Sequence, residues 1–144
     1  MSTLPKKTTS FLENELKRSK SIDSFLDEHQ DELSDCCLSD QLARLMAAKG
    51  LAKSDVVKRG NLNEVYAYQI LSGTRRPSRD KLLCICFALN TTLIETQNLL
   101  KESGFAPLYV RSHRDSIIIF ALTHGHSLLQ LNTDLFDHGE PVLE

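Results

Sequence analysis

Apolar side chains recur along most of the chain at the three- and four-residue spacing of amphipathic helices. The segment SIDSFLDEHQDEL, residues 21–33, carries one apolar stripe on an otherwise acidic helix. The segment LSDQLARLMAAKG repeats this spacing and ends at Gly50, where a left-handed residue commonly closes a helix. No alternating run bounded by hairpin turns occurs, and only the polar residues 1–10 look disordered. The pattern therefore predicts an all-α protein.

The middle of the chain is divided into short helices by turn signals. KSDVVKR ends at Gly60–Asn61, two residues that tolerate a positive φ. Asn63 is the expected cap of the next helix, EVYAYQILS, which stops at Gly73. Pro77 prevents the helix from continuing, and SRDKLLCICFAL restarts behind a serine that can act as its cap.

Two stretches in the C-terminal half resemble each other. FALNTTLIETQNLLKESGFAPL begins at Phe87, and FALTHGHSLLQLNTDLFDHGEPVL begins at Phe120. Each passes through a polar turn into an amphipathic helix that ends at glycine and then proline, and the second copy has the longer turn when both are aligned on Phe-Ala-Leu. This echo predicts two similar helical hairpins in series. The segment DSIIIFAL, residues 115–122, is apolar all round, so we expect it to be buried within the fold or at a subunit interface.

These elements predict three parts. Residues 1–36 form an N-terminal tail and an acidic helical arm, residues 37–104 a central helical domain, and residues 105–144 a helical extension packed on that domain. No apolar run approaches the roughly 18 residues of a membrane span, and the N-terminus lacks the apolar region of a secretory signal. We therefore expect a cytoplasmic protein that does not enter a membrane.

The charge distribution changes the picture that the net charge of −2 suggests. Residues 41–81 hold nine basic and three acidic side chains, whereas residues 1–40 hold five basic and nine acidic, and residues 82–144 three basic and seven acidic. A basic segment between acidic ones is typical of a protein that binds a polyanion. By charge alone, solvated helix faces explain the pattern equally well.

Candidate catalytic and metal-binding motifs are missing. The sequence contains no glycine-rich phosphate loop, no G-x-S-x-G and no H-E-x-x-H, and THGH reads as a polar turn between helices. Cys36–Cys37 and the pair Cys84 and Cys86 lack the spacing of a zinc site. We therefore expect no enzymatic activity, no metal and no cofactor.

A short helix, a tight turn, a second helix and a basic loop follow one another in residues 53–79, as a helix-turn-helix requires. On the second helix, Ala67 and Ile70 would pack inward. The opposite face would be free to touch base edges, and it carries Asn63, Glu64, Val65, Tyr66, Tyr68 and Gln69. Arg75, Arg76 and Arg79 belong to the segment that we call the arginine loop, residues 73–79, where they would neutralise phosphates.

The segment from LARLMAAKG through ILSGTRRPSRDKLLCICFALN, within residues 38–104, resembles the five-helix DNA-binding domain of lambda-repressor-like (Xre-type) bacterial regulators. The resemblance implies a lambda-repressor-like helix-turn-helix fold with an acidic N-terminal helical arm and a C-terminal helical hairpin. It also implies a reading helix at residues 63–72, with phosphate contacts from Lys53 and from the arginine loop. The implied function is sequence-specific regulation of transcription on double-stranded DNA.

Several residues depart from the family's pattern. Val57 replaces a small alanine, Asn61 replaces the turn glycine, and Glu64 places an acid at the start of the reading helix. Tyr66 and Tyr68 are bulkier than the usual serine or threonine. A non-enzymatic adaptor that binds a protein through the same surface is therefore the alternative. Recognition of two half-sites predicts a homodimer, with residues 115–122 or 127–138 in its seam.

Overall fold

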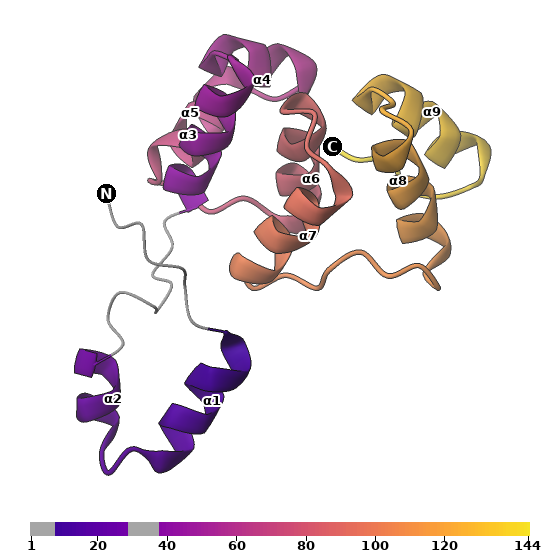
Figure 1. The fold of residues 1–144 in the computed structure, drawn as a ribbon. Coiled ribbons are helices and arrows are strands. Elements are labelled where there is room, and N and C mark those ends of the chain that lie inside the picture. The colour runs from indigo at the N-terminus through magenta and orange to yellow at the C-terminus, as the bar shows by residue number, and fades with distance from the viewer. Residues whose placement is uncertain (1–7, 29–37) are drawn as a thin grey trace. The chain divides into compact units, whose positions relative to one another are not determined.

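A computed structural model describes residues 8–28 and 38–144, and all regular structure in these residues is helical (Figure 1). This confirms the predicted all-α fold. The chain divides into two compact units, residues 1–36 and 37–144. The helices are α1 (Thr9–Arg18) and α2 (Ile22–Glu28) in the first unit, and α3 (Leu38–Lys49), α4 (Lys53–Arg59), α5 (Glu64–Ser72), α6 (Arg79–Ala88), α7 (Leu93–Glu102), α8 (His113–Thr123) and α9 (Leu128–Asp137) in the second.

The first unit contains a helix that the sequence pattern did not reveal. The side chain of Thr8 accepts a hydrogen bond from the backbone N–H of Phe11 and starts α1, so residues 8–10 are ordered, contrary to expectation. Ser21 accepts from the N–H of Ser24 at 3.1 Å and starts α2, as expected. The predicted continuation of α2 through residues 29–33 lies outside the described residues.

Helix α6 lies at the centre of the second unit (Figure 1), in contact with α4, α7 and α9. Residues 82–89 are all buried because LLCICFAL has no polar face to offer to water. Burial raises the pKa of Cys84 to about 11 and that of Cys86 to about 12, so both thiols stay protonated at neutral pH. They act as small packing groups in the core.

Glycine and asparagine have different roles in the turn between α4 and α5. Asn61 has the left-handed φ of 49°, as expected, but Gly60 has an ordinary φ of −84°. Gly60 is buried, and a Cβ added there would lie 2.9 Å from the carbonyl oxygen of Val56. A glycine is needed at this position because the backbone passes too close to α4 for a side chain.

The two hairpins α6–α7 and α8–α9 repeat with an offset of 35 residues. The side-chain amide of Gln97 exchanges two hydrogen bonds with the backbone of Leu108, and the amide of Asn132 does the same with Leu143. Asn132 follows Gln97 by 35 residues, and Leu143 follows Leu108 by the same number. The turns, residues 89–92 and 124–127, have equal length. The expectation of a longer second turn is wrong because alignment on Phe-Ala-Leu displaced the repeat by two residues.

Helix α8 is not buried on all sides within one chain, and its burial at a subunit interface, the other expected alternative, stays a prediction. Ile118 is fully buried, Ile117 and Ile119 are partly buried, and Phe120 is 51% exposed. Helix α8 packs on α7 and α9 and forms two ion pairs with α6, and Phe120 is exposed. None of the described helices is long and apolar enough to cross a membrane.

The close backbone approach at Gly60 can be tested by substitution. Gly60→Ala should lower the free energy of unfolding by about 1–3 kcal/mol because the new Cβ would push α4 away from the turn. Asn61→Gly should leave stability unchanged or raise it slightly, since glycine adopts a positive φ without strain. Urea unfolding measures both variants. A Gly60→Ala variant as stable as the unsubstituted protein would contradict the close approach.

Candidate nucleic-acid interface

Helix α5 packs on α3 and α4 with one face and presents the other face to solvent. The packed face of α5 carries the buried residues Ala67, Ile70 and Leu71. Asn63 is the helix cap, and its side-chain oxygen accepts a hydrogen bond from the N–H of Tyr66 at 3.1 Å. The capping residue starts the helix at the expected position, so the side chains that follow are aimed by a regular first turn.

The exposed face of α5 carries three of the predicted base-reading side chains. Glu64, Val65 and Tyr68 are exposed, and Val65 is 65% exposed although it is apolar. An acceptor, an aliphatic group and an aromatic hydroxyl can respectively meet a cytosine amino group, a thymine methyl group and an acceptor or donor on a base edge. The free face therefore has the chemistry of direct base readout.

Tyr66 is placed differently from this prediction, and Gln69 is less exposed than the three side chains above. Both are partly buried, and Tyr66 packs against the core. The guanidinium carbon of Arg75 lies 4.7 Å from the centre of the Tyr66 ring, and Nη1 of Arg75 donates to Oε1 of Gln69 at 3.4 Å. The amine of Lys81 lies 5.7 Å from the same ring centre. Tyr66 therefore serves as a platform that holds two positive charges beside α5.

Lys81 was not among the predicted site residues. It contributes to the basic charge of the middle segment, but it directly precedes the apolar stretch of α6 and no local signal set it apart. Lys81 lies in the first turn of α6, where its amine reaches the Tyr66 ring. Its part in the cluster depends on the packing of α6 against the helix-turn-helix, which no local pattern indicates.

The backbone holds Arg75 in place. Gly73 has a φ of 85°, and the N–H groups of Thr74 and Arg75 both donate to the carbonyl of Gln69, at 3.0 and 3.2 Å. These bonds satisfy a carbonyl at the end of α5 and turn the chain away from the helix. These bonds therefore fix the path of the backbone at Arg75, just after the end of α5.

The other two arginines of the arginine loop face the C-terminal hairpins. Arg76 donates to the carbonyl of Ser103 and lies 5.4 Å from the Phe105 ring centre. Arg79 forms an ion pair of 3.1 Å with Asp115, and only 24% of its side chain is exposed. The expectation that Arg79 contacts phosphate does not fit this arrangement, because its guanidinium group is already occupied within the protein.

Lys53 is the first residue of α4 and is exposed. It precedes the turn and α5 in the chain order that the helix-turn-helix requires. Asp55 accepts a hydrogen bond from the N–H of Ala52 at 2.9 Å and closes the first turn of α4. The carboxylate of Asp55 is thus engaged in capping, and the first turn of α4 carries one positive and one negative side chain.

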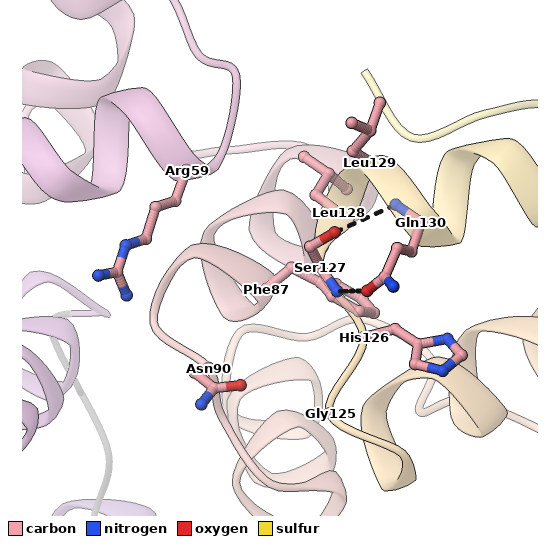
Figure 2. A pocket seen from close by; sticks show the side chains of 9 residues that line it. All are labelled: Arg59, Phe87, Asn90, Gly125, His126, Ser127, Leu128, Leu129 and Gln130. Carbon is pink, nitrogen blue, oxygen red and sulfur yellow. Dashed lines mark hydrogen bonds between the residues drawn. The ribbon is translucent and has the colours of Figure 1, made fainter.

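A pocket lies between the end of α4 and the turns of both hairpins, and Figure 2 shows the residues that line it. Its volume is about 430 Å³. Arg59 and Asn90 line one side, and residues 125–130 line the other. Ser127 and Gln130 form two hydrogen bonds with each other at the start of α9. The N–H of Ser127 donates to Oε1 of Gln130 at 2.8 Å, and the N–H of Gln130 donates to Oγ of Ser127 at 3.2 Å. These donors are therefore satisfied within the helix. Among the described residues, no three histidine, cysteine, aspartate or glutamate side chains are grouped to hold a metal ion.

Comparison with known families identifies the central helices. Residues 41–96 match the family model of the Cro/C1-type helix-turn-helix DNA-binding domain. The match begins within α3, ends within α7 and contains α4, α5 and α6 completely. No curated protein and no solved structure matches the chain. The predicted resemblance to lambda-repressor-like regulators is confirmed by this match, in which residues 41–96 are similar to Cro/C1-type helix-turn-helix DNA-binding domains.

Proposed function

We propose that the protein is a sequence-specific regulator of transcription that places α5 in the major groove of double-stranded DNA. The observation that carries the proposal is the position of Arg75 and Lys81 on the Tyr66 ring, beside the exposed face of α5. The groove is about 12 Å wide and admits a single helix, while flanking cations neutralise the backbone. The protein would act in the cytoplasm and would catalyse no reaction.

The side chains divide into two groups in this proposal. Glu64, Val65, Tyr68 and Gln69 meet base edges, and Asn63 supports them as the helix cap. Phosphates are contacted by Lys53, Arg75 and Lys81, which the structure leaves at helix ends or on the Tyr66 platform. Phosphate contacts fix the register of the protein, and base contacts then select the sequence.

Substitution of Arg75 tests the phosphate contacts of the proposed function. Arg75→Ala should weaken binding to all sequences similarly and flatten the slope of log K against log[salt] by roughly 0.9, the share of one phosphate contact. Gel-shift titrations at several salt concentrations measure the slope. Arg111→Ala, at an exposed arginine outside the matched domain, is the control and should leave it unchanged. An unchanged slope in Arg75→Ala would remove this arginine from the interface.

Substitution of Gln69 separates a DNA reader from a protein-binding adaptor. Gln69→Ala should lose about 1–3 kcal/mol of discrimination at one base pair, because glutamine can bond adenine through two atoms. Gln69 also accepts a hydrogen bond from Arg75, so part of the effect of Gln69→Ala is shared with Arg75→Ala and weakens all sequences alike. The discrimination lost at the one base pair is therefore measured relative to the Arg75→Ala variant. An adaptor would show no DNA binding and would lose a protein partner when Tyr68 is truncated.

We also propose that the protein forms a homodimer through the second hairpin. Three large apolar side chains are exposed there, at 51% for Phe120, 77% for Leu129 and 76% for Phe136. Leu129 and Phe136 are seven residues apart on α9 and so lie on one face of that helix. Exposed apolar surface of this kind is typical of an interaction site, and a dimer would match an operator with two half-sites.

A charge on this face should separate the subunits. Phe136→Asp should give a folded monomer that binds a full operator weakly, because one subunit keeps only one half-site's contacts. Light scattering and circular dichroism measure the mass and the fold. Lys101→Asp alters the exposed residue at the equivalent position of α7 and should leave the mass unchanged. An unsubstituted protein that is monomeric at tens of micromolar would contradict the dimer.

A further inference from the structure

The C-terminal extension and the residues just before it hold the far end of the arginine loop. Arg79 donates from Nε to the carbonyl of Ala106 at 3.0 Å and pairs with Asp115 at 3.1 Å. Arg76 donates to the carbonyl of Ser103. The loop is thus fixed at one end by the bonds of its N–H groups to Gln69 and at the other end by these two arginines.

Asp115 is placed as an anchor rather than as a surface charge. Its side chain is 11% exposed and accepts from both terminal nitrogens of Arg79, at 3.4 and 3.1 Å. It also accepts from the N–H of Tyr109 at 3.0 Å, and its own N–H donates to Ser112 at the start of α8. Several charge-assisted bonds to one carboxylate define a geometry, whereas an exposed ion pair would not.

The repeat of the hairpins provides a second ion pair of the same kind. Arg114 pairs with Asp80 at 3.0 Å and donates to the carbonyl of Pro141 at 3.0 Å. Each hairpin thus sends its arginine to the aspartate of the other. Arg79 is held against residues 106–107, however, while Arg114 is held against residues 141–142 at the end of the chain.

We infer that Asp115 is a positioning residue for DNA binding, which through Arg79 holds the arginine loop and thereby orients Arg75 beside α5. The inference rests on the proposed function. The span from Gly73 to Ser78 contains one buried side chain, that of Pro77, so core packing alone does little to fix it. The direction of Arg75 therefore depends on how the far end of the loop is anchored.

The inference predicts the opposite sign from a phosphate role of Arg79. If Asp115 merely occupied a phosphate-binding arginine, Asp115→Asn would release that arginine and DNA binding would tighten. If Asp115 positions the loop, the same change lets Arg75 move and binding weakens. A purely stabilising ion pair would alter thermal stability and leave the affinity of the folded protein unchanged.

The experiment compares Asp115→Asn with Asp80→Asn in the full chain. Both remove one negative charge and one arginine partner, so the change in net charge is the same in the two variants. The probe is a duplex of about 30 base pairs that the unsubstituted protein has selected from a random pool, long enough for two half-sites. Asp115→Asn should bind about tenfold more weakly than Asp80→Asn, a factor typical of coupling between sites, with a flatter salt slope.

Hydrogen exchange supplies a readout without DNA. The N–H groups of Thr74 and Arg75 should exchange faster in Asp115→Asn and at an unchanged rate in Asp80→Asn, because only the first variant frees the loop. If the unsubstituted protein binds no duplex, the proposed function fails. These two amides then still decide whether Asp115 positions the loop.

If Asp115→Asn does not fold, the Arg79→Lys variant tests the same inference. Lysine keeps the charge that a phosphate would need but cannot bond Asp115 and Ala106 together in the fork geometry of arginine. The affinity of Arg79→Lys for the same duplex should again be about tenfold lower than that of Asp80→Asn. Equal affinity, equal salt slope and equal amide exchange in Asp115→Asn and Asp80→Asn would overturn the inference, and so would tighter binding by Asp115→Asn.

Discussion

The burial of α6 on every side is the constraint on which the second unit depends. Its residues 82–89 are apolar or small, and each is at most 8% exposed. A single layer of helices covers only one side of such a segment. Contacts from α4, α7 and α9 surround it, so the Cro/C1-type domain and the C-terminal extension share one continuous core.

This shared core explains why the interface and the extension are connected. The arginine loop ends at Arg79, the first residue of α6, so the contacts of Arg79 also set the path of the loop. Arg79 and Asp80 at the start of α6 each pair with a residue of α8. An extension that looks separate along the chain thus reaches the segment beside the reading helix. The proposed coupling between the two regions follows from this geometry.

The sequence predicted the fold and the location of the candidate site, and it predicted the partners of individual side chains poorly. Helix α5 begins and ends where Asn63 and Gly73 indicated, because capping involves only neighbouring residues. Helix α1 was missed because its stripe is short and half exposed, and such a stripe is hard to distinguish from a polar tail. The repeat was recognised with its register displaced by two residues. The hydrogen bonds of Gln97 and Asn132 define that register, and they cannot be read from composition.

The sequence by itself determined the helices of the second unit, the helix-turn-helix order and the concentration of basic charge, since each depends on residues within a turn or two of one another. Only the tertiary structure decided what each arginine of the loop does. Arg75 stacks on a ring nearby in the chain, whereas the partners of Arg76 and Arg79 lie 27 to 36 residues away. Three identical side chains within five residues are chemically equivalent until the chain folds. Their surroundings then differ, because the core places α8 and the end of α7 beside two of them and leaves the third beside the reading helix.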